Sequence, residues 1–220
     1  MNELFFDIES VPDQKPGWLD RAKKKVSPPA NYKKPETIEK WWKEEGAAKI
    51  DQAHRDTALD GAYGEIVSIA WQVNDGEIHC ITREADHSEP ALLNDFFDEL
   101  IEEIEPQRLT KWIAHNSDFD LWFLQQRCWV NNIKSPIRIP VDVRPGSELV
   151  ADPMRMFRGY YSRKFISQDE LYRILGGKPY EDDIDGSQVY DLWCQEQYDI
   201  IRDYNIRDVE KLVYTYRRLS

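Results

Sequence analysis

The distribution of apolar and polar residues predicts several strands in the first half of the chain. The first apolar run, Leu4 to Glu9 (LFFDIE), and a second run, Glu65 to Val73 (EIVSIAWQV), have the length and composition of β-strands. Asn74-Asp75-Gly76 follows the second run as a turn, and Glu77 to Arg83 is predicted as the returning strand. The last two strands therefore form a hairpin.

Helical signals become frequent after this hairpin. Ser88 is a suitable N-cap with Pro90 in the first turn, and it predicts a helix that runs to about Ile104. The remaining pattern predicts a strand at Lys111–His115, a helix from Asn116 or Ser117 to about Val130, an irregular region at 132–165 with short strands near Ile137–Val143 and Glu148–Ala151, and helices at Ser167–Gly176, Ser187–Glu196 and Tyr198–Leu219. This order of elements predicts an α/β domain with a mixed sheet.

Residues 10–64 interrupt this pattern with a polar stretch that contains five prolines. Its second half, Glu36 to Leu59, is predicted to be helical. An interruption of this length is too long for a simple connection. We therefore expect an insertion, with a substrate-binding or lid function, within a single domain that covers residues 1–220.

Composition limits the classes of function. The chain has 220 residues, 41% of them hydrophobic, which suffices for one packed domain. A formal net charge of −12 argues against attachment to nucleic acid through a broad basic surface. It leaves open an enzyme that handles a nucleic-acid end through bound metals, because metals invert the local field. Three widely spaced cysteines and no apolar run of membrane-spanning length predict a cytoplasmic protein with reduced thiols.

One short segment is locally basic. Arg155 to Lys164 (RMFRGYYSRK) contains Arg155, Arg158, Arg163 and Lys164, two tyrosines and no acids. Arginines interleaved with aromatic residues suit a phosphate backbone with stacked bases. A solvated loop of ordinary charge is the alternative interpretation.

Asp7 and Glu9 are the first candidates for metal binding. Successive side chains of a strand alternate between its faces, so these two acids project together from one face. Two like charges in an apolar strand are unfavourable unless a cation lies between them. Divalent metals with carboxylate ligands meet this requirement. A strand end that runs into solvent is the alternative.

Two further acids occur where they could join this pair. Asp120 follows the strand at 111–115, where α/β sheets place their sites. Asp118 faces away from Asp120 on the predicted helix, and we interpret it as a helix-start acid. Asp208 lies within an apolar stripe of the last helix, one turn after Tyr204. Such an acid requires either a metal or a buried ion pair, for which an arginine is the expected partner.

Together these segments resemble the tyrosine branch of the DnaQ-like (DEDD) 3′–5′ exonucleases, which have the RNase H-like fold, and in particular the exonuclease domain of family B DNA polymerases. The resemblance is carried by Asp7-x-Glu9, by Asn116 with Phe119-Asp120, and by Tyr204-x-x-x-Asp208. It covers about residues 1–9 and 65–220, and it does not explain 10–64. It implies a five-stranded mixed sheet flanked by helices.

The resemblance also implies a chemistry and its residues. Asp7, Glu9, Asp120 and Asp208 would hold two Mg²⁺ or Mn²⁺ ions, with Asp7 bridging both, Glu9 and Asp208 on the ion beside the attacking water, and Asp120 at the second ion. Tyr204 has an ordinary pKa near 10 and is a poor base, so its expected role is to orient the water. Six residues are candidates for substrate contact: Asn116, Phe119, Arg155, Arg158, Arg163 and Lys164. The products would be nucleoside 5′-monophosphates.

The sequence allows more than one substrate and more than one class of function. Single-stranded DNA is the expected substrate; trimming of RNA or short oligonucleotides is the first alternative. A catalytically idle partner-binding module of the same fold is the second. A chain of this length has no room for a polymerase, so we expect any proofreading role to act in trans with a polymerase or replication partner, in a bacterial cell or a phage-infected host.

Overall fold

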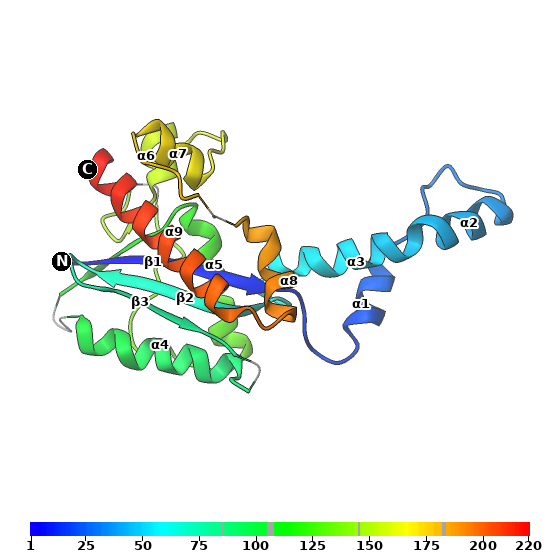
Figure 1. Ribbon diagram of the computed structural model, residues 1–220, viewed down its shortest axis with the longest axis horizontal. Helices are drawn as coiled ribbons and strands as arrows, with labels where there is room; N and C mark the ends of the chain where they lie inside the picture. Colours follow the sequence, from blue (N-terminus) through cyan, green and yellow to red (C-terminus); the bar gives the residue numbers. More distant parts are fainter. Residues whose placement is uncertain (85, 105–107, 145, 182–183) are drawn as a thin grey trace.

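A five-stranded mixed sheet forms the centre of the computed structural model, which describes residues 1–84, 86–104, 108–144, 146–181 and 184–220 (Figure 1). The strand order is β3-β2-β1-β4-β5, with β1 central. β1, β2 and β3 pair antiparallel, whereas β4 and β5 run parallel to β1. The strands are β1 (Asn2–Val11), β2 (Glu65–Val73), β3 (Ile78–Thr82), β4 (Thr110–Ile113) and β5 (Val150–Ala151). This topology confirms the predicted RNase H-like α/β class.

Helices cover both faces of this sheet (Figure 1). α4 (Glu89–Glu103) and α5 (Ser117–Val130) supply apolar side chains to one face, and α9 (Tyr198–Leu219) crosses the other face. The smaller elements on the α9 side are α6 (Pro153–Arg158), α7 (Gln168–Ile174), the 3₁₀ turn η3 (Gly186–Gln188) and α8 (Val189–Cys194). Ser88 and Ser167 cap α4 and α7 as expected, each accepting a hydrogen bond from a backbone amide.

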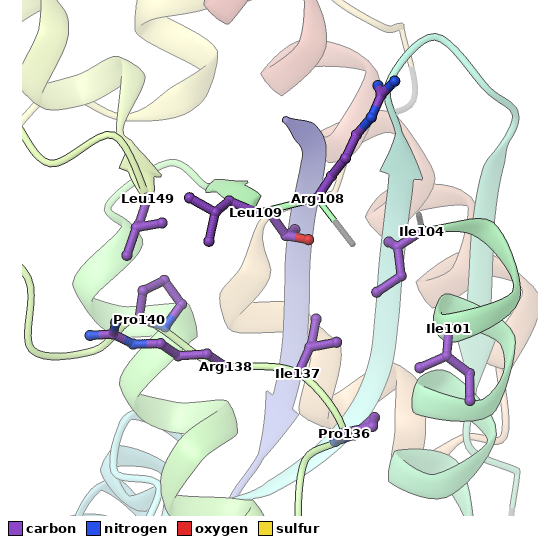
Figure 2. A pocket seen from close by; sticks show the side chains of 10 residues that line it. Ile101, Ile104, Arg108, Leu109, Pro136, Ile137, Arg138, Pro140 and Leu149 are labelled. Carbon is purple, nitrogen blue, oxygen red and sulfur yellow. The ribbon is translucent and has the colours of Figure 1, made fainter. Parts of the chain in front are cut away.

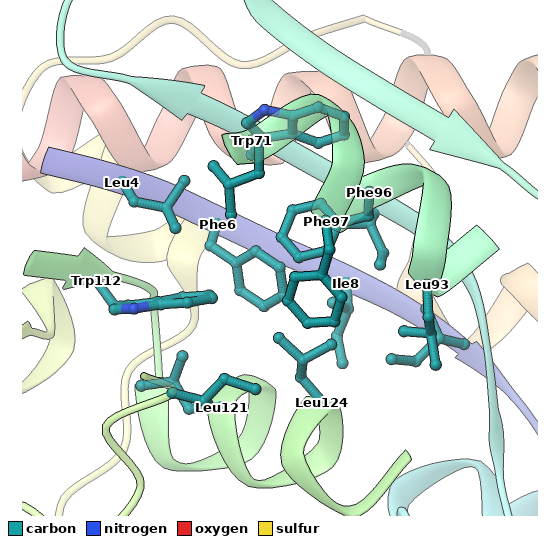
Figure 3. Close-up of a cluster of buried hydrophobic side chains, with 14 of the residues drawn as sticks. Leu4, Phe6, Ile8, Trp71, Leu93, Phe96, Phe97, Trp112, Leu121 and Leu124 are labelled. Atoms are coloured by element: carbon teal, nitrogen blue, oxygen red, sulfur yellow. The ribbon is translucent and has the colours of Figure 1, made fainter. Parts of the chain in front are cut away.

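The alternation of β1 divides the core into two layers. Leu4, Phe6 and Ile8 point toward α4 and α5, where aromatic residues such as Trp71, Phe96 and Trp112 surround them (Figure 3). Phe5 points to the opposite face and packs with Val209, Leu212 and Tyr216 of α9. Because side chains alternate along a strand, Asp7 and Glu9 share the face of Phe5. The core therefore directs both acids toward α9.

The insertion after β1 forms a helical arm that projects from the body (Figure 1). It consists of α1 (Trp18–Lys25), α2 (Pro35–Trp41), a π-helical turn η1 (Trp42–Gly46), α3 (Ala47–Arg55) and a 3₁₀ turn η2 (Asp56–Leu59). The rings of Trp18 and His54 stack with centroids 3.8 Å apart, which joins α1 to α3. Arg55 donates to Asp191 over 2.7 Å and ties the arm to α8.

Several predicted elements differ from the structure. The helix α1 was not predicted, because only Trp18, Leu19 and Ala22 of its eight residues are apolar, too few for a periodic signal. The strand predicted near Ile137–Val143 is wrong: this segment is irregular, and Pro140 cannot donate to a strand ladder. Asp185 rather than Ser187 caps the turn before α8, which begins at Val189. None of the described helices is both long and apolar enough to cross a membrane.

Candidate active site

Asp7 and Glu9 lie where β1 separates from one of its neighbours. Parallel pairing between β1 and β4 ends at Phe5 and Ile113, whereas pairing with β2 continues to Val11. Beyond Phe5, therefore, the β4 side of the strand is free of sheet pairing. A site at the carboxyl end of parallel strands is typical of open α/β sheets. Glu9 is only 9% exposed, so the alternative that the strand ends in open solvent at this position does not hold.

The helix α9 brings Asp208 to this pair. One carboxylate oxygen from each of Asp7, Glu9 and Asp208 lies within 4.8 Å of the other two. Asp208 is about 200 residues away from Asp7 and Glu9 in the sequence, and the packing of α9 across β1 brings it to them. The structure thus assembles three of the four predicted acids into one group.

Asp120 occupies a separate position beside this group. It is 4% exposed in the first turn of α5, and its carboxylate accepts hydrogen bonds from the backbone amides of Asp120 and Ile8. Its negative charge is near enough to raise the pKa of Asp7. Asp120 is therefore fixed in orientation at the rim of the three-carboxylate group.

Burial and mutual repulsion disfavour ionisation of these acids. Burial raises the pKa of Asp7, Glu9 and Asp120 well above the ordinary range, and neighbouring carboxylates raise each of them further. Burial also raises the pKa of Asp208, to about 6, although the Lys211 ammonium and the Tyr204 hydroxyl partly oppose the shift. The pKa of Tyr204 is raised above its ordinary value by burial and by the charges of Glu9 and Asp208. Its hydroxyl stays protonated and donates to Asp208.

Two residues of α9 that the sequence interpretation missed hold the acids in place. Asn205 is fully buried; its Nδ2 donates to Asp7 over 2.7 Å and its Oδ1 accepts from Ser68 over 2.8 Å. Lys211 is also buried, with Nζ 3.1 Å from Asp208 and 2.8 Å from Asp169. The buried ion pair considered for Asp208 exists, but its cation is this lysine and not an arginine. The i,i+3 spacing of Asp208 and Lys211 was the available signal.

Asp152 is a third missed residue, and it acts on α5. Its buried carboxylate accepts from the backbone amides of Asn116, Ser117 and Met154 at 3.2, 3.1 and 2.9 Å. These bonds fix the first turn of α5 and thereby the position of Asp120. A capping acid before a proline-initiated helix was visible in the sequence, but its contact with a second helix was not.

The predicted substrate residues lie in different environments. Asn116 adopts a left-handed conformation (φ 58°) at the start of α5, and Phe119 packs against the core. Arg155 pairs with Asp118 and with Asp152, so its charge is already balanced, and Asp118 faces outward as expected. Arg158, Arg163 and Lys164 are exposed. The structure does not bring these three side chains into the carboxylate group.

The donor set fits divalent cations. Three carboxylates converge and offer only oxygen atoms as metal ligands, and Asp120 adds a fourth acid at the rim. Hard cations such as Mg²⁺ and Mn²⁺ prefer this oxygen-rich environment. Lys211 balances one of the negative charges at the site, and it is shared with Asp169. The residual negative charge is what a bound cation would neutralise.

A separate apolar cavity lies at the opposite end of the sheet (Figure 2). It has a volume of about 320 Å³ and is lined by residues that include Ile101, Ile104, Ile137 and Leu149. Thr110, the first residue of β4, borders it, which places it at the strand end remote from Glu9. No carboxylate occurs among its described lining residues.

Comparisons with known proteins agree with this geometry. The sequence profile of a family described as predicted 3′–5′ exonucleases related to the exonuclease domain of PolB matches residues 59–219. The structure resembles the family B DNA polymerase of the hyperthermophilic archaeon Pyrobaculum calidifontis, with a TM-score of 0.61 and 16% identity. That similarity covers 100% of this chain but 24% of the polymerase, and it establishes the fold. No curated protein sequence matches the chain. The chain belongs to the family of predicted 3′–5′ exonucleases related to the PolB exonuclease domain.

Proposed function

We propose that the protein is a metal-dependent exonuclease that removes nucleotides from the 3′ end of single-stranded DNA and releases nucleoside 5′-monophosphates. The convergence of Asp7, Glu9 and Asp208 within 4.8 Å carries this proposal. A group of buried, mutually repelling acids is costly to maintain in a protein that has no use for a cation there. Retention of all four acids and of Tyr204 disfavours the idle-module alternative.

The four acids would hold two Mg²⁺ or Mn²⁺ ions. The charges of Glu9, Asp120 and Asp208 all raise the pKa of Asp7, so Asp7 is the acid that both ions would share. Glu9 and Asp208 would hold the first ion, and Asp120 would hold the second or its water shell. When bound, such ions supply Lewis acidity that lowers the pKa of a water and neutralises charge on the departing oxygen. Water attacks phosphorus, the bond to the 3′ oxygen breaks, and that oxygen leaves as a hydroxyl of the shortened strand.

The remaining residues of the site position these groups. Tyr204 keeps its proton, because its pKa is raised, and it acts as a hydrogen-bond donor that orients the water or Asp208. Asn205 fixes the Asp7 carboxylate by a neutral hydrogen bond, so it adds no charge that would compete with a cation. Lys211 holds Asp208 in one orientation.

Digestion of end-labelled oligonucleotides tests the proposal. Matched single-stranded DNA and RNA of 20 nucleotides, labelled at either end, would be incubated with Mn²⁺, with Mg²⁺ or with EDTA. We expect stepwise shortening from the 3′ end, faster on DNA and abolished by EDTA or by Asp208→Asn. Internal cuts, release from the 5′ end, or near-normal turnover by the variant would refute the proposal. Faster digestion of RNA than of DNA would show that the substrate is RNA.

A further inference from the structure

The first part of the arm in sequence carries unbalanced positive charge. Residues 15–34 contain seven lysines and arginines and a single acid, Asp20, in a chain of net charge −12. Five of these lysines are exposed and make no ion pair with any residue that the structure describes, and we call them the lysine strip: Lys15, Lys23, Lys24, Lys33 and Lys34.

Lysines on the neighbouring helix behave differently. On α2 and η1, Lys40 lies 3.7 Å from Glu44, and Lys43 lies 2.7 Å from Glu39, both at i,i+4 spacing. These pairs are the usual pattern of a solvated helix face, where each positive charge has an acidic partner. The lysine strip departs from this pattern within the same arm.

Helix stability does not account for the whole strip. Lys23 and Lys24 occupy the last turn of α1, where the helix dipole favours positive charge. Lys33 and Lys34, however, immediately precede the first turn of α2, where the dipole disfavours it. Lys15 lies outside any helix. An external anion is the partner that all five positions could share.

The arm that carries the lysine strip begins at the end of β1 where the acids lie. It leaves β1 two residues after Glu9, and Figure 1 shows it extending beyond the end of that strand. Arg21 pairs with the buried Asp13, and Arg55 pairs with Asp191 of α8. The helical run α2–η1–α3 has 7, 5 and 9 residues, so it is roughly 30 Å long at 1.5 Å per residue.

We propose that the lysine strip binds the phosphate backbone of the nucleic-acid strand whose 3′ end lies at the carboxylates. The proposal rests on the proposed function, and it assigns to residues 15–34 the grip on the strand upstream of the reacting end. For a strand stacked as in a duplex, with about 3.4 Å per phosphate, a length of roughly 30 Å corresponds to about nine nucleotides. The arm therefore favours substrates longer than about ten nucleotides over short fragments.

Salt dependence of binding tests this role. Asp7→Asn protein in EDTA, which cannot hydrolyse, would be titrated against a fluorescein-labelled 30-nucleotide single strand at 50 to 300 mM KCl. Replacing Lys33 and Lys34 by Gln should reduce the slope of log K against log salt by about 1.4, since each single-strand phosphate contact contributes about 0.7. At 0.1 M salt this is a loss of affinity on the order of 20-fold.

The matched control removes the same charge from the same arm. Lys40→Gln with Lys43→Gln also lowers the net charge by two, but these lysines are paired, and the slope should stay within about 0.3 of the parent value. Equal slopes for both double variants, or an unchanged slope after replacement of all five strip lysines, would overturn the proposal. Loss of binding to phosphatidylserine vesicles with unchanged oligonucleotide slopes would also overturn it.

A tetranucleotide separates this inference from the proposed function. The variant with Lys33→Gln and Lys34→Gln, with Asp7 unchanged, should hydrolyse a four-nucleotide DNA at the parent rate, because these two lysines precede α2 at the far end of the arm and such a fragment does not reach them (Figure 1). Failure of every form to hydrolyse the tetranucleotide and the long strand refutes the exonuclease assignment. Hydrolysis with identical length dependence in the parent and strip variants refutes only the role of the strip.

Discussion

Replacing Asp7 by Asn should stabilise the protein when no metal is bound. Asp7 is half-buried beside Glu9 and Asp208, with carboxylate oxygens within 4.8 Å of one another. At this distance and an effective dielectric of about 20, two full charges repel by roughly 3.5 kcal/mol. Protonation relieves part of this cost, because the pKa values of the acids are raised. Asn keeps the size of the side chain and can still accept the 2.7 Å hydrogen bond from Asn205.

The net gain should be about 2 to 4 kcal/mol at pH 8 in EDTA, and the thermal midpoint should rise by roughly 5 to 15 °C for a chain of this size. Urea unfolding followed by circular dichroism measures the free energy directly. Saturating Mn²⁺ should then largely cancel this difference in stability. Parent protein gains about 3 kcal/mol at one hundred times the dissociation constant, whereas the variant gains much less because a ligand is missing.

Asp203→Asn is the control for this experiment, because Asp203 is an exposed acid on the same helix as Asp208. It changes the net charge equally and should shift stability by no more than about 0.5 kcal/mol. If Asp7→Asn were no more stable than the parent in EDTA, the acids would not repel one another as the geometry requires. An equal Mn²⁺-induced gain in both proteins would show that Asp7 does not contribute to a metal site.

Three further perturbations address the site and the core. The metal-free protein should lose up to about 3 kcal/mol of stability as pH rises from 4 to 7.5, because the pKa of Asp208 is about 6 in the folded protein and lower in the unfolded chain. Protonation of Asp208 therefore favours the folded state at low pH, and this contribution is lost as pH rises through 6. Urea unfolding in EDTA at several pH values measures the loss, and a rise in stability over this range would contradict it. Tyr204→Phe should lower kcat about 10- to 100-fold with little change in Mn²⁺ affinity, since one hydrogen bond to a charged group is lost. Single-turnover digestion measures the effect on the rate, and calorimetry measures the affinity for Mn²⁺. Arg127→Met should cost about 3 to 5 kcal/mol in unfolding free energy, because the buried Glu89 would lose its partner at 2.6 Å; an effect below 1 kcal/mol would count against this.

The sequence predicted those parts of the fold in which local signals agree. The strand Glu65–Val73 and the helix Tyr198–Leu219 have the predicted bounds, because each has an uninterrupted apolar pattern and clear ends. The alternation in β1 placed Asp7 and Glu9 on one face without knowledge of what covers that face. The position of Asp208 within an apolar stripe then indicated that the covering element would be the last helix.

Contacts between segments that are distant in the sequence could not be predicted from local patterns. Asn205 and Lys211 are ordinary polar residues of a helix until the packing of α9 buries them against Asp7 and Asp208. The same holds for Asp152, whose carboxylate serves two helix starts at once. In the arm, α1 has too few apolar residues for a periodic signal, and it is held by the stacking of Trp18 on His54.

The opposite charges of the site and the arm bear on how an acidic protein could handle a polyanion. A chain of net charge −12 repels nucleic acid at long range, and unligated carboxylates would repel the phosphate at the reacting end most strongly. Cations at Asp7, Glu9 and Asp208 would invert the field at that end only, over a distance of a few ångströms. The strand upstream of it lies outside their reach, because charges separated by more than about 8 Å are largely screened at physiological salt. Attraction there requires fixed positive charge on the protein. The unpaired lysines of residues 15–34 would provide it, on an arm that leaves the sheet two residues after Glu9.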